Sequence, residues 1–262
     1  MVQGPPIERN ASRWRRARRA LEFVLGVLFV VGTGVGVAWG AYRYALASPR
    51  FAIRSIDVEG SRRFGPAEVS QIAGIHPGIN AFALDIRAAE RRLAADPWIE
   101  SAKITRRLPS RLSVQLSENE PVALAALGDR LFLLTPQGVP FKRFAVGDPH
   151  DLPLVTGMTD QELGGEEGSV RIGTALAVLR QYERLRMSKA YPAQEVHMTD
   201  AGAVVLVVGA SGIALFLGEG PWPKKLQMAE RAFGLLAAKG QVPETVFLDN
   251  RAHPERVVVR VR

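Results

Sequence analysis

A charge-free stretch of twenty residues, from Phe23 to Tyr42, constrains this 262-residue chain more than any other feature. A helix rises about 1.5 Å per residue, so the stretch covers about 30 Å, the thickness of a bilayer hydrocarbon core. Trp39, Tyr42 and Tyr44 lie near its C-terminal end, and aromatic rings favour the membrane–water interface. The stretch therefore predicts a transmembrane helix over residues 21–46.

The net charge of +8 is concentrated before this stretch. Residues 1–20 hold six arginines and one glutamate, so the rest of the chain carries only +3. Arginines on the N-terminal flank favour a cytoplasmic N-terminus and export of the chain beyond the span. A nearly neutral remainder argues against a basic groove for nucleic-acid phosphates. We expect a basic cytoplasmic tail over residues 1–20, with residues 50–262 outside the cytoplasm and no nucleic-acid partner.

A cleaved signal peptide is the alternative to an anchor. Residues Ala45 to Ser48, "ALAS", resemble a small-x-small cleavage site. The apolar region of a signal peptide has about 7–15 residues, and this stretch is longer, which favours an uncleaved anchor. Both interpretations place residues 50–262 outside the cytoplasm. The chain has no cysteine, so an exported domain must be held together by packing alone.

Three glycines in the stretch, Gly32, Gly36 and Gly40, recur at spacings of four. Small residues at that spacing fall on one helix face and let two membrane helices approach closely. Glycine is also common in membrane helices without such a contact. The stripe is a candidate surface for transmembrane packing, and the sequence leaves self-association open.

Residues 51–118 give strand and helix signals in the order strand, helix, helix, strand, strand. In "FAIRSIDVEG" the apolar alternation slips by one residue at Arg54–Ser55, which favours a β-bulge over a loop between two short strands. Pro66 suits the first turn of a helix that Gly74 ends. Asp85 is a candidate N-cap for a second helix. A hairpin then turns at Leu108-Pro109-Ser110.

The remaining chain predicts a second, β-rich domain with two helices, so the fold class is α+β. The helices are expected over residues 175–186 and 222–240. A hairpin over 131–141 and strands over 203–208, 212–218, 245–249 and 255–262 complete it.

No pattern in the chain assembles a reactive site. The four histidines, His76, His150, His197 and His253, are isolated, without the short His or Glu spacing of a metal site. Nucleophile motifs and phosphate loops are absent from the sequence. We expect no enzyme activity, cofactor or metal, although an anchored envelope enzyme with a site assembled by the fold stays an alternative.

Four segments carry a resemblance to a known family. They are "IDVEG" with its closing Gly60, Gly78-Ile79-Asn80, the run Asp96–Leu112, and "SENEPVA" at Ser117–Ala123. They resemble the recurring pattern of a POTRA domain. A basic tail, one anchor, one POTRA unit and about 140 further residues together resemble the FtsQ (DivIB) family of cell-division proteins. The sequence departs from the family near Thr135, where an aspartate is common.

The resemblance implies a non-catalytic bitopic scaffold of the bacterial divisome that links early and late division proteins and controls septum assembly. It implies residues 50–120 as the POTRA domain and 121–262 as a β domain, exported from the inner membrane at the division septum. Partners would be the FtsB/FtsL coiled-coil pair through the last strand and an FtsK-like early protein through the POTRA domain. The alternative is a POTRA-containing envelope protein for outer-membrane protein assembly or secretion.

The family receives the FtsB/FtsL pair along its last β-strand. Here that region is Asp249–Val261, where Asn250 replaces a leucine of the family. We expect an edge strand with its outward amides, including that of Val258, free for a partner strand. Its arginines are expected to meet partner carboxylates. The alternative is that the valines only complete the core. The candidate partner-binding residues are Asp249, Asn250, Arg251, Arg256, Val257, Val258, Val259, Arg260 and Val261.

Overall fold

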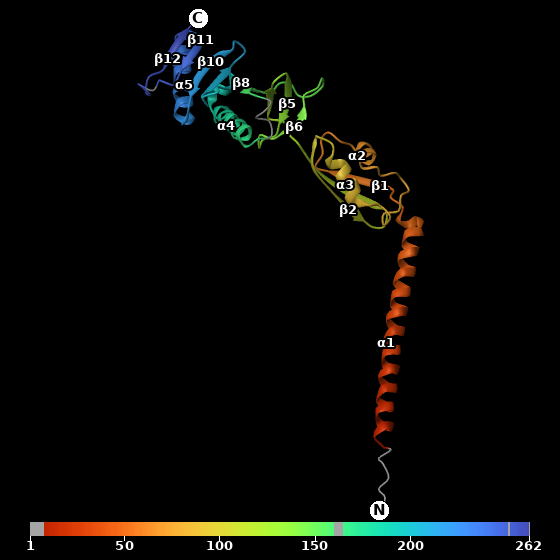
Figure 1. Cartoon of the computed structure of the whole chain (residues 1–262). Helices are drawn as coiled ribbons and strands as arrows, with labels where there is room; N and C mark the ends of the chain where they lie inside the picture. The colour runs from red at the N-terminus through yellow and green to blue at the C-terminus, as the bar shows by residue number, and fades with distance from the viewer. Residues whose placement is uncertain (1–7, 160–164, 251, 262) are drawn as a thin grey trace, which may run out of the picture. The chain divides into compact units, whose positions relative to one another are not determined.

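The structure is a computed structural model that describes residues 8–159, 165–250 and 252–261. The chain divides into two compact units, which are described separately. The first comprises Met1–Ala95 and Ser101–Ser117, and the second comprises Asp96–Glu100 and Glu118–Arg262. Figure 1 labels their helices and strands.

The first unit begins with α1 (Glu8–Ala47), a single long helix (Figure 1). Its part from Leu21 to Ala47 has a mean hydropathy of 2.1 in its most apolar window, and none of that window is buried. Because apolar side chains exposed along the whole window are unfavourable in water, this part of α1 is suited to lipid. Among the described residues it is the one candidate membrane span, as the sequence predicts.

The rest of the first unit is a three-stranded sheet with two helices, in the predicted order. Its sheet has the strand order β1-β3-β2, and β1 runs parallel to β3. The core includes Val69, Leu93, Leu112 and Val114, all fully buried. The elements are β1 (Ser55–Glu59), α2 (Pro66–Ala73), α3 (Ile86–Ala94), β2 (Ile99–Arg107) and β3 (Arg111–Glu118).

The helix boundaries agree with the sequence signals. Pro66 is the first residue of α2, and Gly74 ends it in the left-handed region with φ +67°. The Asp85 carboxylate accepts a hydrogen bond from the N–H of Ala88 (3.0 Å) and caps α3. These three predictions are confirmed, because each depends on local backbone chemistry.

The predicted bulge at Arg54–Ser55 is wrong. Strand β1 begins only at Ser55, and the residues before it bond elsewhere. The N–H of Ile53 donates to the carbonyl of Ile79 (2.9 Å), whereas that of Arg54 donates to Ser110 (2.8 Å). The slip in the apolar alternation therefore marks a change of partner, from a loop to the β2–β3 turn, rather than an extra residue in one strand.

The second unit is built on a nine-stranded sheet with the order β12-β11-β10-β9-β8-β7-β4-β5-β6. The sequence predicted six of these strands and missed β4, β7 and β8. The strands are β4 (Ala123–Leu127), β5 (Arg130–Leu134), β6 (Pro140–Arg143), β7 (Leu154–Met158), β8 (Ala193–Met198), β9 (Val204–Val208), β10 (Ile213–Gly218), β11 (Pro243–Phe247) and β12 (Val258–Val261).

Two helices, α4 (Glu166–Glu183) and α5 (Trp222–Ala238), pack on one face of this sheet. The predicted pair of helices is confirmed, with α4 beginning nine residues earlier than expected. Tyr182 on α4 is fully buried, and its hydroxyl donates to the carbonyl of Tyr191. Burial, followed by the nearby Tyr191 and Glu230, raises the pKa of Tyr182 well above its usual value, so the hydroxyl keeps its proton.

Candidate functional site

Strand β12 lies at one end of the nine-stranded sheet. It pairs antiparallel with β11, with Thr245 opposite Arg260 and Phe247 opposite Val258. Within the described part of the chain, β12 has a strand neighbour on that side alone. The predicted edge strand is therefore confirmed, and a row of main-chain groups faces outward from the sheet.

The hydrogen bonding of β11 fixes which of its groups face β12. The N–H of Leu248 donates to the carbonyl of Phe216 on β10 (2.9 Å). Successive residues of a strand direct their N–H and C=O groups to opposite sides. Thr245 and Phe247 therefore direct their main-chain groups toward β12.

The same alternation decides which main-chain groups of β12 are open. Val258 and Arg260 lie opposite Phe247 and Thr245, so their N–H groups point back into the sheet. Val259, between them, directs its N–H and C=O to the open side. The donor at Val258, expected to face a partner, is turned toward β11 instead.

The side chains of the strand alternate between the two faces of the sheet. Val257 and Val259 are half-buried and pack against the core. Val258 is 53% exposed and Val261 39% exposed. The alternative that the valines only complete the core thus holds for Val257 and Val259, whereas Val258 and Val261 are exposed.

Two of the candidate arginines, Arg256 and Arg260, are exposed and lie near carboxylates of their own chain. Arg260 Nε is 3.2 Å from Glu244 Oε2, and the arginine side chain is 75% exposed. Arg256 Nε is 3.8 Å from Glu255 Oε1. Glu244 was missed by sequence reasoning, because the pairing of β11 with β12 that brings it beside Arg260 is not readable from either segment alone.

The residues before the strand form a turn. The Asn250 side chain accepts hydrogen bonds from the N–H groups of Ala252 (3.1 Å) and His253 (3.0 Å), so this asparagine holds the turn in place. Asp249 is exposed beside it. Arg251 lies outside the described residues.

The candidate glycines of α1 are open to their surroundings. A Cβ placed on Gly32, Gly36 or Gly40 meets no atom within 4 Å. The stripe is therefore an exposed surface of the helix.

A row of apolar side chains crosses the sheet face opposite the helices and ends at the edge. Val205, Phe216, Phe247 and Val258 are register partners on β9 to β12. The two phenylalanine rings stack with centroids 4.9 Å apart and planes at 19°. Sequence reasoning missed this row, although continuous apolar runs in β9 and β10 signal two apolar faces.

Three polar residues meet on the same face further into the sheet. The Thr156 hydroxyl lies 2.5 Å from Glu195 Oε1 and 2.8 Å from His197 Nδ1. In a hydrolytic triad the imidazole lies between the hydroxyl and the carboxylate, whereas here the hydroxyl lies in the middle. Among the described residues no group of three or more His, Asp or Glu side chains is arranged to hold a metal ion.

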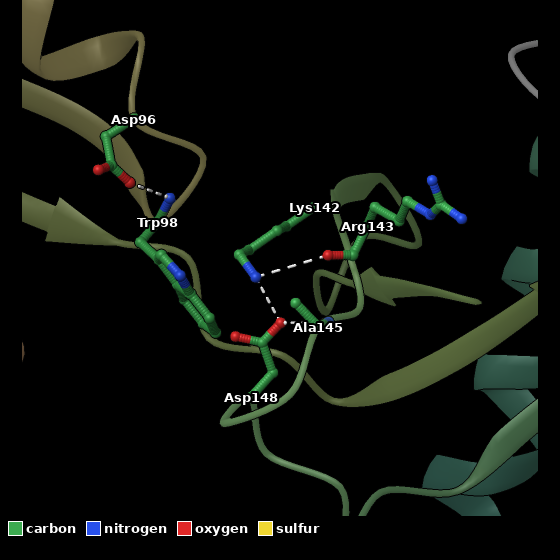
Figure 2. A network of polar contacts seen from close by, with 6 residues as sticks. All are labelled: Asp96, Trp98, Lys142, Arg143, Ala145 and Asp148. Carbon is green, nitrogen blue, oxygen red and sulfur yellow. Dashed lines mark hydrogen bonds and ion pairs between the residues drawn. The ribbon is translucent and has the colours of Figure 1, made fainter. Parts of the chain in front are cut away.

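At the opposite edge of the sheet, the Lys142 side chain of β6 is held by residues outside that strand (Figure 2). The Lys142 ammonium bonds the Asp148 carboxylate and lies 5.4 Å from the centroid of the Trp98 ring. Trp98 and Phe141 meet edge to face, 5.5 Å apart. Pro140 begins the strand and has no N–H to offer.

Comparisons with known proteins agree with this architecture. The family model described as "POTRA domain, FtsQ-type" matches residues 51–119, and "Cell division protein FtsQ/DivIB, C-terminal" matches residues 123–248. The cell division protein FtsQ of Myxococcus fulvus is 39% identical over 247 residues, covering 93% of this chain and 85% of the relative. That of an Anaeromyxobacter species is 32% identical, covering 100% of this chain and 90% of the relative. A Geobacter relative is 27% identical, covering 99% and 94%.

Proposed function

This chain belongs to the FtsQ/DivIB family of cell-division proteins, and from that premise we propose that it is a non-catalytic, bitopic scaffold of the divisome. It links early and late division proteins and controls septum assembly. The relatives named as cell division proteins support this role over outer-membrane assembly or secretion. The order of Glu195, Thr156 and His197, with the hydroxyl in the middle, supports a non-catalytic role.

The proposed topology places residues 1–20 in the cytoplasm and residues 21–46 across the inner membrane. The POTRA domain (50–120) and the β domain (121–262) are periplasmic, at the division septum. Support comes from the arginines before the span, since basic flanks are retained in the cytoplasm, and from the exposed apolar surface of α1.

The proposed docking site for late partners is the β12 edge. An incoming strand of an FtsB/FtsL-like pair bonds to the outward N–H and C=O of Val259, extending the sheet by one strand. The observation that carries this proposal is that β12 has one strand neighbour among the described residues and an exposed, alternating surface. An FtsK-like early protein binds the POTRA domain.

Side chains of the edge supply specificity in this proposal. Val258 extends the apolar row of Phe216 and Phe247 to the sheet edge, where it meets an apolar partner residue. Arg260 exchanges the exposed Glu244 carboxylate for a partner carboxylate, and Arg256 acts in the same way. Such charge-assisted contacts fix the register of the added strand.

The test is capture of a tagged FtsB/FtsL pair by the full-length protein in membranes. Val259→Pro removes the outward donor and should weaken capture at least about tenfold, the effect of losing a main-chain hydrogen bond together with the fit of the strand. Arg143→Pro on β6 is the matched control. The N–H of Phe144 donates to Leu131 on β5, so the N–H of Arg143 points away from the sheet and capture should be unchanged.

The Arg260→Glu variant tests whether weaker capture by Val259→Pro results only from loss of folding. It keeps the backbone intact, and should weaken capture while leaving the melting temperature within about 2 °C, since an exposed ion pair contributes little stability. If both variants fold and both capture the pair at wild-type strength, the docking strand is not β12.

A further inference from the structure

The Asn80 side chain ties a loop of the first unit to the end of the membrane helix. Its Nδ2 lies 2.8 Å from the carbonyl oxygen of Ala45 and 2.9 Å from that of Leu46. These carbonyls belong to the last turn of α1, which has no intrahelical donors for them. Asn80 Oδ1 accepts the N–H of Phe82 (2.9 Å), so one amide holds both the helix end and its own loop.

The same loop is held from the other side by Arg106 on β2. Its Nε donates to the carbonyl of Ala81 (2.6 Å) and its Nη2 to that of Leu84 (2.8 Å). Phe51, four residues beyond α1, packs edge to face on Phe82 with ring centroids 5.0 Å apart. Residues 78–84 are therefore joined both to the helix end and to the sheet of the first unit.

The β2–β3 turn lies at this same end of the sheet. Ala52 forms a β-bridge with Asn80, and two residues later the N–H of Arg54 donates to the carbonyl of Ser110 in the turn. Strand β1 starts at Ser55, directly opposite Arg111 at the start of the parallel β3. Residues 78–84, which we call the clamped loop because Asn80 and Arg106 hold it, lie at the same end of the sheet as this turn. This is the end to which α1 is attached, and we call it the proximal end.

The exposed charged side chains around the β2–β3 turn are basic, and the tip of the turn is apolar. Leu108 in the turn is 56% exposed. Arg54, Arg107 and Arg111 around the turn are exposed, as is Arg50 just beyond the helix. The one carboxylate that borders the clamped loop in sequence, Asp85, bonds the N–H of Ala88 at the start of α3.

The length of α1 places the clamp at the depth of lipid head groups. The charge-free stretch ends at Tyr42, and Ala45 to Ser48 come three to six residues later, about 5–9 Å along a helix. The head-group region is about 5–8 Å thick on each side of the hydrocarbon core. A loop bonded directly to Ala45 and Leu46 therefore lies in or next to that layer.

We propose that the proximal end of the first unit docks on the membrane surface by binding anionic phospholipid head groups. Arg50, Arg54, Arg107 and Arg111 contact lipid phosphates, and Leu108 enters the interface between them. The Asn80 clamp holds this surface at the right depth. The inference rests on the proposed membrane anchorage and adds a lipid partner to it.

The test uses the full chain, whose lack of cysteine allows single spin labels without background. The protein is reconstituted in vesicles of phosphatidylcholine alone or with one quarter phosphatidylglycerol. Collision with oxygen and with a water-soluble nickel complex then reports the depth of each label. A label at Leu108→Cys should report head-group depth in the anionic vesicles and move toward water in the neutral ones.

Two further labels separate the possible failures. A label at Val35→Cys, in the middle of the charge-free stretch, should report the hydrocarbon core in both membranes. A label at Glu59→Cys, at the far end of β1 and about 13 Å further along the strand, should report water. A Val35 label outside the hydrocarbon would refute the membrane anchorage itself. The lipid docking is tested separately, by the depth of the Leu108 label.

Charge reversal tests the arginines against a matched control. Each arginine near an anionic surface raises the docked population about fivefold, so Arg107→Glu with Arg111→Glu should return the Leu108 label to water. Arg62→Glu with Arg63→Glu makes the same charge change beyond Gly60, at the other end of β1, and should leave the label at head-group depth. The Asn80→Ala variant should raise amide hydrogen exchange over residues 78–84, while Asn119→Ala, which removes a side-chain bond to Pro97, should leave it unchanged.

If the Leu108 label is aqueous in anionic vesicles while the Val35 label reports hydrocarbon, the lipid docking is wrong. An equal effect of the two arginine pairs would also overturn it, because the response would then be to net charge rather than to a surface at the proximal end.

Discussion

The two edges of the nine-stranded sheet both have main-chain groups that face outward, but their side chains treat these groups differently. Each edge strand has about four residues and one strand neighbour among the described residues. On β6 the edge begins with Pro140, and Lys142 is bound between Asp148 and Trp98. On β12 the exposed residues are Val258 and Arg260, and the contact of Arg260 with Glu244 is itself exposed.

The difference lies in how firmly each edge is held by side chains of the chain itself. A proline and an inward-turned charge are common means of blocking an edge against further pairing. The side chain of Lys142 on β6 is 21% exposed and that of its partner Asp148 is 10% exposed, so opening this edge means exposing a partly buried ion pair. Freeing Arg260 from Glu244 costs little, because exposed ion pairs are weak. The docking strand that we propose is therefore expected to pair with β12 rather than with β6.

A substitution between β7 and β8, in the middle of the sheet that both edges belong to, should have the largest effect on stability. Gly157 in β7 has φ +81°, and a Cβ there would lie 1.9 Å from the carbonyl oxygen of Met198 on β8. Gly157→Ala should therefore lower the free energy of unfolding by at least about 2 kcal/mol and weaken both edges together. The measurement is urea unfolding followed by capture of the partner pair.

Gly173→Ala is the control for this change, because its Cβ meets nothing within 4 Å in α4. It should be neutral or stabilising by up to about 1 kcal/mol. A Gly157→Ala protein as stable as the wild type would show that β7 and β8 separate more easily than their geometry indicates.

A smaller effect is expected when β6 alone is loosened. Lys142→Met removes the ammonium from the Asp148 carboxylate, which keeps its bond from the N–H of Ala145. The loss should be about 1–3 kcal/mol in the free energy of unfolding, the range for a bond to a charged group. Capture by β12 should be unchanged, and the exposed Lys224→Met is the control for stability. Weakened capture by the Lys142 variant would mean that the two edges are coupled.

The smallest effect is expected at the ion pair of the β12 edge. Glu244→Gln removes the carboxylate beside Arg260 and should change the free energy of unfolding by less than about 0.5 kcal/mol. It should leave capture unchanged or slightly stronger, because Arg260 then has no competing carboxylate at this position. A stability loss above about 1 kcal/mol, measured by urea unfolding, would show that the Arg260–Glu244 pair stabilises the fold. The ion pairs of β12 and β6 would then no longer differ in this respect.

The sequence by itself determined the features that depend on local chemistry. The apolar stretch, the Asp85 cap, the Gly74 stop and the hairpin turn at Leu108–Ser110 were readable, because each is set by residues close together in the chain. The strands that alternate cleanly or run apolar throughout, such as β9 and β10, were readable for the same reason. The three missed strands were harder to read: β7 contains Gly157, β8 mixes Glu195 and His197 with its buried residues, and β4 is a run of Ala and Leu, which favour helix.

Only the tertiary structure decided which groups meet across the sheet. It placed β12 beside β11, turned the N–H of Val258 inward and that of Val259 outward, and brought Glu244 to Arg260. It also replaced the expected bulge at Arg54 with a change of hydrogen-bond partner, and joined Asn80 to the end of α1. The residues of a strand by themselves predict how its side chains alternate. The side on which its amides pair is set by a neighbouring strand that is distant in the chain.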